Sequence, residues 1–140
     1  MLYAAYGSNL DHARMLARCP GAAPAGSALL PGWRLAVNRF ATIERDGIAT
    51  VPIGLWRITE AHRRALDIAE GVALRIYRAA MLDIPGHGAA LTYIEQRHRP
   101  GPPSVAYVAH LRQGYADFAL DGAALDAALA RWSIASRRVM

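Results

Sequence analysis

Short apolar runs, interrupted by glycine and proline, set the fold class of this 140-residue chain. Trp33, Leu35 and Val37 alternate with more polar residues, which is the pattern of a half-buried strand. The predicted strands are residues 3–6, 33–37, 48–51, 54–58, 76–84 and 89–95, and the last two form a β-hairpin about Pro85-Gly86-His87-Gly88. Residues 22–32 are expected to be a connection, and Asp46-Gly47 a turn.

Helices are expected in the stretches where helix formers follow a capping residue. The predicted helices are residues 11–18, 59–70 with Thr59 as N-cap, 104–118 with Ser104 as N-cap, and 121–132. Because strands and helices do not alternate, a doubly wound parallel sheet is disfavoured. We expect one α+β domain, residues 1–140, with a small mixed, barrel-like β-sheet and peripheral helices.

Composition narrows the class of protein. Hydrophobic residues make up 54% of the chain and charged residues 19%, which is typical of a folded soluble protein. No run approaches the ~20 apolar residues of a membrane helix, and the N-terminus has no secretory pattern, so we expect a cytoplasmic protein without a membrane partner. The one cysteine, Cys19, is expected to be a small buried or loop residue.

The basic charge comes entirely from arginine. The formal net charge is +5, the chain has no lysine, and the arginines are scattered, so we expect a solvated basic surface and no nucleic-acid partner. No metal site is expected, because the histidines lack ligand spacing: these are His12, His62, His87, His98 and His110. Neither common phosphate-binding glycine motif occurs, so no cofactor is expected.

The first predicted strand breaks at Gly7-Ser8-Asn9. Glycine lets a ligand approach the main chain, and Ser8 and Asn9 add hydrogen-bonding side chains. The segment could therefore cradle a small polar group, although the same pattern is also ordinary turn chemistry.

Glu70 is the carboxylate of most chemical interest. It lies at the predicted C-terminus of the helix over residues 59–70, with Asp67 one turn before it and apolar neighbours at Ile68 and Val72. The helix dipole, the like charge and an apolar setting all favour the protonated carboxyl. Glu70 is thus a candidate general acid/base, and the alternative is a solvated glutamate beside the glycine that ends the helix.

These two segments together resemble the γ-glutamylcyclotransferase family, including its AIG2-like branch. The first has Tyr-x-x-Tyr-Gly-Ser-Asn-Leu at residues 3–10, and the second has Leu-Asp-x-x-Glu-Gly-Val at residues 66–72. The similarity covers roughly residues 1–130 and includes residues 18–20, 30–35, 77–78, 92–94 and 103–107. The segment from Thr42 to Trp56 is shorter than in many relatives, which leaves substrate size and acceptor recognition open.

The resemblance implies a small mixed α/β barrel and a cofactor-free enzyme of glutathione metabolism that acts on a γ-glutamyl compound. It implies Glu70 as the catalytic acid/base. The substrate-binding residues that it implies are Tyr3, Ala4, Ala5, Tyr6, Gly7, Ser8, Asn9 and Tyr107. The expected reaction is release of 5-oxoproline through attack of the substrate's α-amine on its own γ-carbonyl. A non-catalytic ligand-binding module and an amide hydrolase on the same fold are the alternatives. The leaving group and the oligomeric state stay open.

Overall fold

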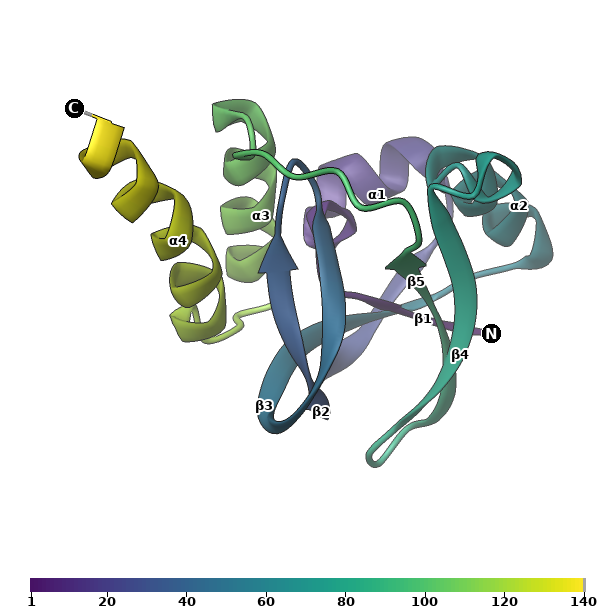
Figure 1. Cartoon of the computed structure of the whole chain (residues 1–140). Helices are drawn as coiled ribbons and strands as arrows, with labels where there is room; N and C mark the ends of the chain where they lie inside the picture. Colours follow the sequence, from purple (N-terminus) through teal and green to yellow (C-terminus); the bar gives the residue numbers. More distant parts are fainter. Residues whose placement is uncertain (140) are drawn as a thin grey trace.

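The computed structural model describes residues 1–139 and is built on one mixed sheet with helices along its sides (Figure 1). The elements are β1 (Leu2–Ala5), η1 (Ser8–Leu10), α1 (His12–Arg18), β2 (Ala23–Val37), β3 (Ala41–Arg57), α2 (Glu60–Ala69), η2 (Val72–Leu74), β4 (Tyr77–Ile84), β5 (Gly88–Glu95), α3 (Val105–Asp117) and α4 (Ala123–Val139). The α+β class predicted from the sequence is confirmed. Of the described helices, none is long and apolar enough to cross a membrane.

The five strands run in the order β2-β3-β1-β5-β4, and only β1 and β5 pair in parallel. The sheet is open, so the expectation that its strands close into a barrel is wrong in this respect. Side chains nevertheless bridge separated strands, since the Tyr77 hydroxyl donates to the Ala41 carbonyl at 2.6 Å and the Thr42 hydroxyl accepts from the Glu95 N–H at 3.0 Å. These two bonds bring β4 and β5 against the start of β3 without a backbone ladder between them.

The long β2–β3 hairpin differs most from the sequence prediction. Residues 23–32, expected to be a connection, form the first part of β2, and Asp46-Gly47 lies inside β3 instead of at a turn. The chain reverses at residues 38–40, where the Asn38 N–H donates to the Phe40 carbonyl. The register shifts between Pro31 and Trp33, so the extra residues around Asp46-Gly47 are absorbed as a bulge.

Three of the four predicted helices agree with the structure to within one residue at each end, and the fourth, predicted to end at Trp132, continues to Val139. The Thr59 and Ser104 side chains accept the expected N-cap hydrogen bonds, and the Asp11 side chain, for which no cap was predicted, accepts one at the start of α1. In Figure 1, α1 lies between α2 and α3 along one side of the sheet. Gly114 allows α3 to approach η1 closely, because a Cβ there would lie 2.3 Å from the Leu10 Cβ and 2.6 Å from the Asp11 N. The contact holds the loop after β1 in place.

Candidate active site

A cavity of about 280 Å³ lies where the loop after β1 meets the end of α2, the start of β4 and the start of α3. Its wall combines aromatic side chains with charged groups. The residues that line it are Tyr3, Tyr6, Gly7, Ser8, Asn9, Arg14, Arg18, Phe40, Ala41, Ile68, Ala69, Glu70, Gly71, Leu74, Ile76, Tyr77, Tyr93, Arg99 and Tyr107. A mostly apolar cavity with a few convergent polar groups is the usual form of a small-molecule site.

Asn9 connects the first motif to the second. Its Nδ2 donates to the Tyr3 hydroxyl at 3.0 Å and to the Glu70 Oε1 at 3.4 Å, and its Oδ1 accepts from Arg18 Nη1 at 2.8 Å. Its backbone carbonyl accepts from Trp56 Nε1 at 3.1 Å. Because Asn9 and Trp56 are buried, this network fixes the position of the amide that contacts the glutamate.

Glu70 reaches the cavity because α2 ends there. Its N–H donates to the Leu66 carbonyl at 2.8 Å, and Gly71 then takes a left-handed conformation with φ of 64°. A Cβ at Gly71 would lie 2.9 Å from Ile76 Cδ1, so both the backbone angle and the space favour glycine. The glycine turn leaves Glu70 on the wall of the cavity and sends the chain on to β4.

Burial raises the pKa of Glu70 above its ordinary value, and the positive charges of Arg18, Arg14 and Arg99 oppose the rise. The direction agrees with the sequence analysis, and of the causes expected there the apolar setting is the main one. Asp67 does not produce this shift, and its Oδ1 accepts a hydrogen bond from the Tyr93 hydroxyl at 2.7 Å. A carboxyl between a desolvating cavity and nearby guanidinium groups can both accept and release a proton.

Gly7 is needed for space, not for an unusual backbone angle. Its φ is −117°, which other residues can adopt. A Cβ at this position would lie 3.2 Å from the Ala41 Cβ and 3.5 Å from the Tyr107 hydroxyl. The backbone of Gly7 therefore forms a narrow part of the cavity wall.

Tyrosine hydroxyls surround this narrow part. Tyr107 Oη accepts from the Ala41 N–H at 2.9 Å, and Tyr77 donates to the Ala41 carbonyl. The Tyr6 hydroxyl donates to the Tyr93 carbonyl. Burial raises the pKa of Tyr6, Tyr77 and Tyr107, so these hydroxyls remain neutral around Glu70.

The structure brings most of the predicted site residues to this one cavity. They are Tyr3, Tyr6, Gly7, Ser8, Asn9, Glu70 and Tyr107. Ala4 and Ala5 do not line it, because they lie inside β1, buried between β3 and β5. The Ala4 carbonyl instead accepts from the Thr92 hydroxyl at 2.9 Å.

Sequence analysis missed three arginines in the cavity wall. Arg14 and Arg18 come from successive turns of α1, and Arg99 comes from the segment that follows β5. Burial lowers the pKa of Arg14, and the like charge of Arg18 adds to that effect. For these three residues the expectation of a solvated basic surface is wrong. Arg14 and Arg18 are spaced i, i+4 in the helix that follows Gly7-Ser8-Asn9. This spacing could have indicated that both side chains lie on one face of the helix, near that segment.

Three of the histidines and the cysteine have structural contacts. His110 Nδ1 lies 2.8 Å from Asp11 Oδ2, His62 Nε2 lies 2.6 Å from the Pro20 carbonyl, and the His12 ring packs against Trp56 and Phe118. Cys19 is buried, as predicted. Within residues 1–139, no cluster of three or more His, Cys, Asp or Glu side chains is arranged to hold a metal ion.

Comparisons with known proteins point to one fold. No protein-family model matches the sequence. No curated protein matches it either. A solved γ-glutamyl cyclotransferase is similar, with 25% identity, a TM-score of 0.79, and coverage of 86% of this chain and 80% of that one.

Two further solved structures share the fold. The human uncharacterized protein loc79017 is 26% identical, with a TM-score of 0.78 over 85% of this chain and 80% of that one. YkqA from Bacillus subtilis is 26% identical, with a TM-score of 0.73 over 83% of this chain and 48% of its own. These similarities support the family resemblance drawn from the two sequence motifs.

Proposed function

We propose, from the premise that the chain has the fold of the γ-glutamylcyclotransferase family, that it releases 5-oxoproline from a γ-glutamyl compound. The observation that carries this proposal is the position of Glu70. Among the described residues that line the cavity it is the only carboxylate, and it is hydrogen-bonded to the Gly-Ser-Asn segment through Asn9. A cleft with one perturbed carboxyl is a candidate site for acid/base chemistry.

The reaction requires no enzyme nucleophile. The substrate's α-amine nitrogen attacks its γ-carbonyl carbon, a carbon–nitrogen bond closes the five-membered lactam, and the original amide bond to the leaving amine breaks. The Glu70 carboxylate takes the proton that the attacking nitrogen loses and returns it to the leaving nitrogen. Because both reacting groups belong to one molecule, holding the substrate in a folded conformation supplies much of the rate enhancement.

The cavity also contains groups suited to the substrate's charges. Backbone N–H groups at Gly7 and Ser8 are suited to anchor the γ-glutamyl group and to stabilise the developing oxyanion. The Arg14 Nε is buried without a hydrogen-bond partner among the described residues, and this guanidinium can hold the substrate's α-carboxylate. Neutral tyrosine hydroxyls complete the wall without adding a competing charge.

The test is a screen of γ-glutamyl amino acids and γ-glutamyl amines for products. Release of 5-oxoproline supports the proposal. Release of free glutamate would identify an amide hydrolase, and saturable binding without any product would identify a binding module. A control substrate that is N-acetylated at the α-amine should give no 5-oxoproline, because that nitrogen can no longer attack the γ-carbonyl.

A further inference from the structure

The mouth of the cavity contains a positive charge that the proposed reaction at Glu70 does not use. Arg99 lies on the segment that joins β5 to α3, and its side chain is 29% exposed. Its guanidinium lies over the Phe40 ring, 4.8 Å from the ring centroid. This stacking holds a planar donor group at the entrance.

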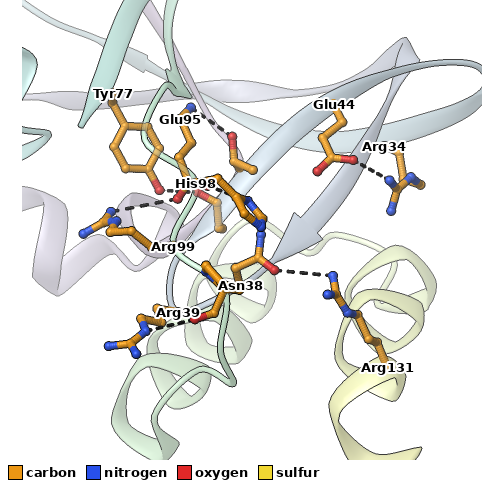
Figure 2. Close-up of polar contacts among 12 residues, drawn as sticks. Arg34, Asn38, Arg39, Glu44, Tyr77, Glu95, His98, Arg99 and Arg131 are labelled. Carbon is orange, nitrogen blue, oxygen red and sulfur yellow. Dashed lines mark hydrogen bonds and ion pairs between the residues drawn. The ribbon is translucent and has the colours of Figure 1, made fainter. Parts of the chain in front are cut away.

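The hydrogen-bonding capacity of Arg99 is not used up by protein groups. Figure 2 shows Arg99 directed toward Glu95, but Nη2 is 3.9 Å from Glu95 Oε2, which is too far for a hydrogen bond. Arg99 Nε is buried and has no partner among the described residues, and the same holds for Glu95 Oε2. The guanidinium has further N–H donors at its terminal nitrogens, so an anion at the mouth would gain charge-assisted hydrogen bonds from them.

Exposed apolar side chains line the same cavity as this charge, and they are called the rim here. Three hydrophobic side chains both line the cavity and face solvent: Phe40 is 39% exposed, Ile68 82% and Leu74 66%. A ligand that covered these side chains would remove their apolar surface from water, which would favour binding. The mouth therefore offers one cationic donor beside an apolar surface.

We propose that the leaving group is an α-amino acid with an apolar side chain, an inference that rests on the proposed cyclotransferase function. Its carboxylate binds the Arg99 guanidinium, and its side chain packs against the rim formed by Phe40, Ile68 and Leu74. A leaving group that carries a second ammonium, such as a diamine, would meet the positive charges of Arg14, Arg18 and Arg99. The substrate class is thus the γ-glutamyl derivatives of leucine-like amino acids.

Three substrates separate the two parts of this subsite. γ-Glutamyl-leucine carries both groups, γ-glutamyl-isopentylamine lacks only the carboxylate, and γ-glutamyl-glycine lacks only the side chain. We expect kcat/KM for 5-oxoproline release to fall about 10- to 100-fold without the carboxylate. Without the side chain we expect a fall of about 10-fold. Equal values for γ-glutamyl-leucine and γ-glutamyl-isopentylamine would overturn the proposal.

Arg99→Gln tests the carboxylate contact. It should lower kcat/KM for γ-glutamyl-leucine much more than for γ-glutamyl-isopentylamine, so that the ratio of the two values, measured at one pH, approaches one. Arg78→Gln, at an exposed arginine of β4 that does not line the cavity, removes the same charge and should affect neither substrate. An equal loss on both substrates in Arg99→Gln would show a structural role and would overturn the proposal.

Leu74→Ala tests the rim. It should lower kcat/KM for γ-glutamyl-leucine several-fold and leave γ-glutamyl-glycine unchanged. Ile48→Ala is the matched control, because Ile48 is 97% exposed on β3 and does not line the cavity. No change in Leu74→Ala would contradict the proposed apolar contact.

Failure of the proposed function gives a different result from failure of the subsite. If no substrate yields 5-oxoproline, the cyclotransferase assignment is wrong, and calorimetric titration of the same three compounds still tests the subsite. Tighter binding of γ-glutamyl-leucine than of the other two, lost in Arg99→Gln, would support the subsite. Equal binding of all three would overturn it.

Discussion

The inner end of the cavity and its mouth are built in opposite ways. At the inner end, Asn9 makes hydrogen bonds with Tyr3, Arg18 and Glu70. At the mouth, Arg99 Nε has no hydrogen-bond partner among the described residues. The inner end is therefore suited to holding a reacting group in one position, whereas the mouth has bonding capacity for a ligand. Chemistry and specificity are expected to respond to different substitutions.

The largest expected effect comes from Glu70→Gln, which keeps the size of the side chain but cannot cycle a proton. We expect kcat to fall by about 10²- to 10⁴-fold, at the upper end of that range because one carboxyl serves both proton transfers. Substrate binding, measured by titration, should survive. Near-normal turnover would rule out the proposed mechanism.

The same variant should not unfold the protein. Burial raises the pKa of Glu70 in the folded state above its value in the unfolded chain. Ionisation of this carboxyl therefore lowers the free energy of unfolding as pH rises through the folded-state pKa. A neutral amide removes this loss, so a thermal melt near neutral pH should give an equal or slightly higher Tm. A large drop in Tm would mean that lost activity reflects lost structure.

Gly7→Val tests whether the inner end is as narrow as its contacts indicate. The added side chain must displace Ala41 or Tyr107, and a misplacement of about 1 Å costs about 10²-fold in rate. Activity should be measured beside a thermal melt, with Gly47→Val as the control, because a Cβ at Gly47 meets nothing within 4 Å. Unaltered turnover in a folded Gly7→Val protein would exclude the cradle.

Tyr107 lies between the inner end of the cavity and its mouth, because its ring packs edge-on against Phe40 of the mouth. The substitution Tyr107→Phe therefore tests both regions. Loss of the hydroxyl leaves the buried Ala41 N–H without its acceptor, so we expect the free energy of unfolding to fall by about 1 to 3 kcal/mol. A lost hydroxyl contact to the substrate would raise KM by roughly 5-fold. Kinetic constants equal to those of the parent protein would identify a purely structural tyrosine.

Arg18→Gln should change the pH profile more than the maximal rate. Arg18 is the largest of the charges that lower the pKa of Glu70, so its removal should raise that pKa. The acid limb of the kcat profile should then move to higher pH. A limb that stays in place, or that moves to lower pH, would show that the profile does not report Glu70.

Chelation should have the smallest effect of all. We expect turnover to survive dialysis against a metal chelator with no cofactor added, because neither region offers a cluster of metal ligands among the described residues. Loss of activity that a divalent ion restores would contradict this prediction.

Local sequence predicted those parts of the fold that depend on near neighbours. The caps at Thr59 and Ser104 and the β4–β5 turn are set by bonds within a few residues, so pattern alone located them. The long hairpin was mispredicted because Pro24, Gly26, Pro31 and Gly32 read as loop residues. They occur in β2, which lies at the edge of the sheet, where a missing N–H is tolerated.

The two motifs alone indicated the Gly-Ser-Asn segment and Glu70, because their residue types carry the chemistry. Only the tertiary structure decided that Asn9 bonds to Glu70, 61 positions away, and that Arg14, Arg18 and Arg99 share one wall. The shift in the pKa of Glu70 depends on burial and on charges from distant segments, and neither can be read from adjacent residues. Which arginines face solvent and which face the cavity is decided by packing, since the charge of the side chain is the same in both places.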